Sequence, residues 1–284
     1  MSVRSIHQVI PALAVSEGAG VTVHRTIGTP PLRHLDPFLM LDHFSSDNPD
    51  EYIAGFPDHP HRGFITLTYM IDGHMLHEDS MGNRGDLRAG GVQWMKAASG
   101  VIHSEMPQQS HGLMRGFQLW INLPGREKMS EPAYQDYAAE RIPVVESKET
   151  RVKIIGGSFA GHTGPIVDPN TQVTYLDVTL VPGASFQHAL SESATAFVYP
   201  FEGSIKIGAT ERGAHSLIVL NSGDELNTSA GGKGGRFILV AGLPLNEPIV
   251  QYGPFVMNSE QEIHQAFDDY RNNRLVRSRA TVSH

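Results

Sequence analysis

Two short histidine motifs are the part of this sequence best suited to chemistry. His59 and His61 are separated by one proline, and His103 and Glu105 by one serine. Residues two apart on a β-strand project from the same face, so each pair can direct both side chains at one point. If the two strands are neighbours in a barrel, all four side chains meet inside it. Three nitrogens and one oxygen suit a borderline divalent metal such as Fe, Ni, Cu, Mn or Zn.

The glycines around these pairs favour a metal site over a His-x-His pair with a purely structural role in a loop. The first pair is followed by Thr66 and Gly73, at the spacing of the first cupin motif, with Thr66 where a glutamate often stands. Gly85 and Gly100 precede His103, as in the second cupin motif. The chain contains no cysteine, so thiolate ligands are excluded. We therefore expect one ion held by nitrogen and oxygen.

The chemistry expected of such an ion is catalytic. Four protein ligands leave one or two coordination positions open, which is typical of a catalytic metal. Three neutral histidines and one carboxylate leave a divalent ion with a net positive charge. The site should therefore attract an anion. An iron or copper centre with such ligands can bind a chelating enolate or catecholate and then activate oxygen, so we expect a small aromatic, enolate-type substrate together with O2.

The elements that must position these residues read as β-strands. Alternation of apolar and polar residues recurs along the chain in segments rich in Val, Ile, Thr and aromatic residues, bounded by Gly, Pro, Asn or Asp. A helix is expected only near the C-terminus, with Ser259 as its N-cap and apolar residues spaced three and four apart. This pattern predicts an all-β fold with a short C-terminal helix. The predicted strands are residues 20–27, 64–71, 91–97, 115–123, 152–159, 174–181, 195–208 and 235–242.

A weak internal repeat predicts two tandem barrels. The order of strand, Gly-rich turn and strand in the first half recurs in the second. We expect residues 1–130 to form a metal-binding barrel, and residues 131–284 to form a barrel without metal, plus the terminal helix. The polar residues 125–150 are interpreted as a connection. In the second half the corresponding hairpin offers only His188, which we interpret as a surface or packed residue.

The chain resembles the pirin family, whose members are bicupins. The resemblance covers about residues 35–270. It implies two jelly-roll barrels, with an iron-type metal on the positions of His59, His61, His103 and Glu105 in the first. The segments that carry it are LDPFLMLDHF, FPDHPHRGFITLTYMIDG, HEDSMGN, VIHSEMP, GFQLWINLPGREKMSEPAYQ and EPIVQYGPFVMNSEQEI.

Two functions follow from the resemblance. One is a quercetin 2,3-dioxygenase-type oxidoreductase that opens flavonols with O2 and releases carbon monoxide. There Glu105 binds the metal and accepts the proton of the flavonol 3-hydroxyl. The other is a non-catalytic regulator that binds a protein partner and uses its metal as a redox switch. Both alternatives stay open at this point.

Four further residues are candidates for the substrate pocket. His77 and Asp79 share a strand face, and a pocket role competes with a turn-stabilising one. Trp94 precedes the second metal pair, so it can line the cavity or fill the core. Gln118 alternates with apolar neighbours and can face inward with the metal.

Composition limits the remaining functional classes. The formal net charge of the 284 residues is −8, and the main basic cluster is the scattered tail 271–284. This argues against direct binding of nucleic acid. The sequence has no run of eighteen apolar residues, so we expect no membrane helix, and we do not interpret the N-terminus as a signal peptide. We expect a cytoplasmic protein that is monomeric, because tandem barrels already supply the pairing that single cupins obtain by dimerising.

Overall fold

The computed structural model describes residues 2–277. Of the predicted basic tail, residues 271–277 lie in this range, and the part after Arg277 falls outside the described residues. Contacts group the chain into two compact units. We call the first the histidine barrel (residues 14–28, 38–139 and those from 245 onward) and the other the second barrel (residues up to 13, 29–37 and 140–244). The predicted boundary at residue 130 stays a prediction.

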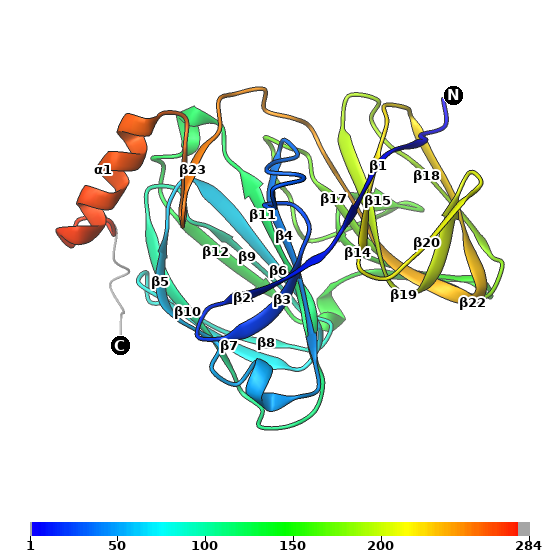
Figure 1. The fold of residues 1–284 in the computed structure, drawn as a ribbon, viewed down its shortest axis with the longest axis horizontal. Helices are drawn as coiled ribbons and strands as arrows, with labels where there is room; N and C mark the ends of the chain where they lie inside the picture. The colour runs from blue at the N-terminus through cyan, green and yellow to red at the C-terminus, as the bar shows by residue number, and fades with distance from the viewer. Residues whose placement is uncertain (1, 278–284) are drawn as a thin grey trace. The chain divides into compact units, whose positions relative to one another are not determined.

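Two sheets face each other in the histidine barrel (Figure 1). A seven-stranded sheet has the order β12-β9-β6-β11-β4-β3-β2, and a four-stranded sheet has the order β5-β10-β7-β8. The larger sheet consists of β2 (Leu13–Glu17), β3 (Val21–Arg25), β4 (Phe38–Ser46), β6 (Phe64–Asp72), β9 (Val92–Lys96), β11 (Met114–Asn122) and β12 (Ala133–Tyr137). The smaller consists of β5 (Phe56–His61), β7 (His74–Asp79), β8 (Arg84–Arg88) and β10 (Val101–Pro107).

The central strand β6 shows how the sequence builds this barrel. Eight of its nine residues are buried, so both of its faces are covered. Cross-strand pairing aligns Thr68 with Gln93 of β9 and with Gln118 of β11. Leu67 aligns with Trp94 and Leu119 in the same way. Because paired residues share a face, Thr68, Gln93 and Gln118 lie on one side of the sheet, and Leu67, Trp94 and Leu119 lie on the other.

The C-terminal segment belongs to the histidine barrel by its contacts. It contains β23 (Val250–Tyr252), β24 (Phe255–Met257) and the helix α1 (Glu260–Arg271), which lies beside β23 in Figure 1. Ile263 and Ala266 of α1 pack against Phe255 and Met257. The Ser259 side chain accepts a hydrogen bond from the backbone N–H of Glu262, which confirms the predicted N-cap. The sequence placed this helix with the second half of the chain, but its apolar face packs on the histidine barrel.

The second barrel is built around one large sheet. Its main order is β1-β21-β19-β22-β17-β14-β13, with β18 on β22 and β20 on β19. The N-terminal strand β1 therefore forms an edge of this sheet. The strands are β1 (Ile6–Pro11), β13 (Val144–Glu146), β14 (Thr150–Gly156), β17 (Thr174–Leu180), β18 (Ser185–Ala189), β19 (Thr195–Ile207), β20 (Thr210–Gly213), β21 (Ser216–Leu220) and β22 (Glu225–Gly242), with a small hairpin of β15 (Ser158–Phe159) and β16 (His162–Thr163).

Helical structure is minor in the described chain, as the sequence predicted. Besides α1 there are 3-10 helices at Pro49–Glu51, Gly125–Glu127 and Ala139–Arg141. Among residues 2–277, no helix has both the length and the apolar character needed to cross a membrane.

Candidate metal centre

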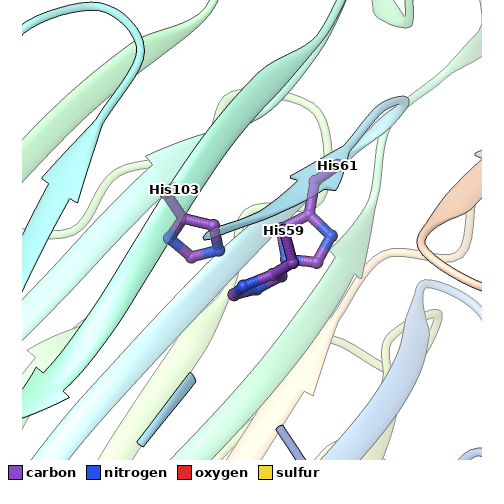
Figure 2. Close-up of side chains that lie close together, drawn as sticks. All are labelled: His59, His61 and His103. Carbon is purple, nitrogen blue, oxygen red and sulfur yellow. The ribbon is translucent and has the colours of Figure 1, made fainter. Parts of the chain in front are cut away.

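Three histidines converge inside the histidine barrel, as the spacing predicted. β5 and β10 pair antiparallel, so His59 lies opposite His103 and His61 lies opposite Val101. One ligand nitrogen from each of the three rings lies within 4.8 Å of the other two. Figure 2 shows the three rings turned toward a common point. The strand pairing alone brings together residues that are far apart in sequence.

The electrostatics of this cluster suit a bound cation. His61 and His103 are 3% and 1% exposed. Burial lowers the pKa of both rings well below the usual value, and neighbouring imidazoles lower it further. His61 Nδ1 and His103 Nε2 are buried and have no hydrogen-bond partner in the described chain. A neutral imidazole with a buried, unpaired nitrogen is the form that binds a metal, so the residues present fit a divalent ion.

His59 completes the set from a more open position. Its Nδ1 lies 2.8 Å from the backbone oxygen of Pro57, so this nitrogen is the donor. The other ring nitrogen, Nε2, is then left as the acceptor. His59 is the most exposed of the three rings, which leaves the cluster accessible from this side.

His77 and Asp79 lie directly behind His103. His77 Nδ1 is 3.3 Å from His103 Nδ1, and His77 Nε2 is 3.3 Å from Asp79 Oδ2. Burial would raise the pKa of Asp79, but hydrogen bonds from His77 and Asn83 lower it overall. Because the Asp79 carboxylate can only accept, His77 donates through Nε2 and accepts through Nδ1. His103 then carries its proton on Nδ1 and directs the Nε2 lone pair away, as a metal ligand requires.

Glu105 lies in the same barrel but outside the close histidine group. The β10–β5 register shifts between His103 and Glu105, which places Glu105 opposite Phe56. Its side chain is buried, and the Thr68 hydroxyl lies 3.2 Å from Glu105 Oε1. Within the described residues, the group whose donor atoms all lie within 4.8 Å of one another contains the histidines alone. Its role as a fourth ligand therefore stays a prediction.

Gln118 faces inward, as expected, and is linked to Glu105 through Thr68. Thr68 Oγ1 lies 2.5 Å from the atom assigned as Gln118 Oε1. A hydroxyl has one proton and cannot donate both to this oxygen and to the Glu105 carboxylate. The two ends of an amide have nearly the same shape, so turning the Gln118 amide over resolves the conflict. Gln118 then donates to Thr68, and Thr68 donates to Glu105.

The tryptophan beside the histidines is Trp120, not Trp94. Trp120 lies 5.1 Å from the His61 ring and stacks on Phe64 at 4.2 Å, both measured between ring centroids. Trp94 pairs with Leu67 and so lies on the face opposite Gln118. Trp120 has the same strand parity as Gln118, which is the sequence signal that could have identified it.

Arg62 is a residue near the site that the sequence did not single out. It directly follows His61 and is 1% exposed. Its guanidinium donates to Asp269 Oδ2 at 2.8 Å and to the backbone oxygen of Ser99 at 2.7 Å. The ion pair connects α1 to β5. The partners are too far apart in sequence for a local pattern to indicate the contact.

Comparison with known proteins places this geometry in a family. The pirin family model matches residues 20–121, and the model of the pirin C-terminal cupin domain matches residues 175–276. A Pseudomonas aeruginosa protein that carries the provisional name quercetin 2,3-dioxygenase is 47% identical over 269 residues, covering 92% of this chain and 94% of the relative. Human pirin is 42% identical over 266 residues, covering 90% of this chain and 89% of the relative.

Solved structures agree with this placement. The crystal structure of a quercetin 2,3-dioxygenase from Acinetobacter baumannii matches with a TM-score of 0.89 and 30% sequence identity, covering 96% of this chain and 99% of the other. The all-β fold of two cupin domains expected from the motifs is thereby confirmed. With both family models matched and relatives aligned over nearly its whole length, the chain belongs to the pirin family.

Proposed function

We propose that this chain is a metal-dependent dioxygenase that opens flavonols such as quercetin with O2. One divalent metal, iron in the first instance, would be held by His59, His61 and His103, with Glu105 as the fourth ligand. The observation that carries the proposal is the pair of buried, unpaired ring nitrogens on His61 and His103 beside the third imidazole. Its support from relatives is the similarity to the A. baumannii protein, which is named quercetin 2,3-dioxygenase.

The metal, when bound, would supply positive charge for a deprotonated substrate and a centre for oxygen chemistry. The chain's own residues have separate tasks. Glu105 accepts the proton of the flavonol 3-hydroxyl, and Thr68 holds its carboxylate in place. His77 fixes the ring of His103. The stacked rings of Phe64 and Trp120 offer an apolar wall for the aromatic substrate.

The test is turnover by the protein loaded with one metal at a time. Metal-free protein is loaded anaerobically with Fe, Ni, Cu, Mn or Zn, mixed with quercetin and then exposed to O2. We expect flavonol absorbance to fall and carbon monoxide to appear. His61→Ala should lose the metal, whereas Glu105→Ala should retain metal but lose turnover.

A lack of turnover with every metal would reject the dioxygenase proposal. The regulator with a protein partner would then be the function to test, by comparing partner recovery from lysate with reduced and oxidised protein. Equal recovery in both states would count against the redox switch.

A further inference from the structure

The second barrel contains a cavity of about 130 Å³ that the proposed reaction does not use. Its lining residues Thr174, Ala189 and Ala241 lie near one end of β17, β18 and β22, respectively. Its polar lining includes Gln172, Thr174 and His188, and its apolar lining includes Ala194, Ala241 and Leu243. All of these residues belong to the second barrel.

The strand that carries His188 occupies the place of the metal-binding strand in the repeat. β18 carries Phe186 and His188 two residues apart, as β5 carries its two histidines. The residues paired with them on β22 are Thr228 and Leu226, so no second imidazole or carboxylate faces His188 across this pairing. One imidazole does not make a metal site. This cavity therefore suits an organic ligand rather than an ion.

Three polar side chains in the cavity wall are available to a ligand. The His188 ring, the Thr174 hydroxyl and the Gln172 amide make no side-chain hydrogen bond to other residues in the range 2–277. Burial lowers the pKa of His188, which keeps its ring neutral at pH 7 with one donor and one acceptor nitrogen. Among the described residues, no Lys, Arg, Asp or Glu side chain lines the cavity, so a charged ligand would find no counter-charge there.

The position of the His188 ring is set by packing. Its centroid lies 5.8 Å from that of Phe159 and 6.2 Å from that of Phe186. Phe186 in turn packs against Phe237 in the core of the barrel. A polar group held by its neighbours binds with a smaller loss of conformational entropy than a free one.

The size of the cavity limits the ligand to about one ring. A cavity of roughly 150 Å³ accommodates benzene in an engineered protein. We propose that the second barrel binds a monocyclic phenol. The ring lies against Ala241 and Leu243, and the hydroxyl group bonds to His188 and Thr174. The site is independent of the metal centre and carries no catalytic group.

The test is a titration of the metal-free full chain with phenol, so that the ligand cannot bind a metal. The Cε1–H resonance of His188 is followed by NMR, and the heat of binding by calorimetry. We expect saturable binding of one phenol that shifts the His188 resonance. Thr174→Val should weaken binding at least about fivefold, because it removes one hydroxyl partner without changing the shape.

Two further variants keep this test decisive. Ala189 lines the cavity but is exposed, so Ala189→Phe can block the cavity and leave the fold intact, and it should abolish the His188 shift. His61→Ala alters only the metal centre and should leave phenol affinity unchanged. Phenol binding that survives Ala189→Phe, no His188 shift up to the solubility limit, or equal binding of glycerol would each overturn the proposal.

Discussion

The direction of one hydrogen-bond chain sets the state of a ligand ring. Asp79 accepts from His77, and His77 accepts from His103, so His103 presents an unprotonated Nε2. Asp79 itself is held by the backbone N–H groups of Met81 and Asn83, at 2.9 and 3.0 Å. The carboxylate is thus oriented before any metal binds. Because it can only accept, His77 must donate to it, and His103 must donate to His77.

Asp79→Asn should weaken metal binding by about 10- to 100-fold, the usual cost of losing such an outer partner. The amide can donate to His77, which allows the chain to reverse and place the proton of His103 on Nε2. The dissociation constant is measured by competition with a chelator. Asp86→Asn is the matched control, since Asp86 bonds His74 near the surface. Equal metal affinity in wild type and Asp79→Asn would contradict the role given to Asp79.

Thr68→Val should lower kcat at least about tenfold with little change in metal content. The hydroxyl is the donor to the Glu105 carboxylate, and such a bond to a charged group contributes about 1.5–3 kcal/mol. Thr66→Val is the control, because Thr66 lies on the same strand face and is equally buried. Thr68→Ser should retain activity. If Thr68→Val lost its metal instead, Thr68 would be supporting the histidine cluster rather than Glu105.

The limits of sequence reasoning are clearest among these side chains. The convergence of His59, His61 and His103 was predictable, because spacing of two on a strand fixes a shared face. The distance of Glu105 from the histidine group depends on a register shift opposite β5, which spacing within β10 does not reveal. For Trp94 the sequence left pocket and core open, and its pairing with Leu67 puts it on the sheet face opposite Gln118.

A buried ion pair stabilises the packing of the terminal helix on the histidine barrel. The buried ion pair between Arg62 and Asp269 joins β5 to α1, and the two side chains are 1% and 6% exposed. Asp269→Asn leaves the guanidinium without its counter-charge, at a cost of about 3 kcal/mol in the free energy of unfolding. Urea denaturation measures this loss. Asp268→Asn is the control, since Asp268 is exposed and bonds Arg274; equal effects of the two changes would show that the buried pair has no special role.

Lys128 is a second connection, and it predicts a dependence of stability on pH. Its Nζ donates to the backbone oxygens of Gly63 and Val256 and to Asn122 Oδ1. Burial lowers its pKa to about 7, although the charges of Glu247 and Glu262 oppose this. The unfolded chain, with a pKa near 10.5, therefore binds more protons between about pH 7 and pH 10.5.

The stability that Lys128 contributes through this linkage is present above pH 10.5 and is lost as pH falls to about 7. The difference in unfolding free energy between wild type and Lys128→Met should rise by about 1.4 kcal/mol per pH unit between those limits. Denaturation at several pH values measures the slope. A difference that does not change with pH would mean that Lys128 stays charged in the fold.

Polar composition misled the prediction of one element. Residues 125–150 were interpreted as a connection, but they contribute β12 to the sheet of the histidine barrel and β13 to that of the second barrel. Both are edge strands with at least one exposed face, where polar side chains are expected. Backbone pairing with β9 and with β14 forms these strands, so the apolar signal used to recognise strands is weak there.

At the scale of the whole molecule, the repeat predicted two barrels but not which segments build them. The pirin model and the model of its C-terminal cupin domain match one segment in each half of the chain, which is the two-domain order that the repeat predicted. The two compact units are not continuous in sequence: residues up to 13 group with the second barrel, and those from 245 onward with the histidine barrel. Both groupings depend on contacts between residues more than two hundred positions apart in sequence. Periodicity within one sequence does not indicate such contacts.

The N-terminal segment should therefore control the stability of the second barrel. Arg4 is 1% exposed, and its guanidinium donates to the backbone oxygens of Ser191, Ala194 and Asn221. β1 then pairs with β21 along the edge of the sheet. Arg4→Ala removes these three charge-assisted bonds, including the buried one to the Ala194 oxygen, which should lower the unfolding free energy of this barrel by about 3 kcal/mol. Val3→Ala is the control, because Val3 is 53% exposed.

Two probes can locate the loss within the molecule. Both tryptophans of the chain lie in the histidine barrel, so their fluorescence reports on that unit, whereas far-UV circular dichroism reports on both. In Arg4→Ala, the dichroism transition should begin at a lower urea concentration than in wild type, while the fluorescence transition stays in place. Loss of coincidence between probes is the sign that unfolding is no longer two-state. A shift of both transitions by the same amount would instead show that the two barrels unfold as one cooperative unit, and the grouping of β1 with the second barrel would then have no separate energetic meaning.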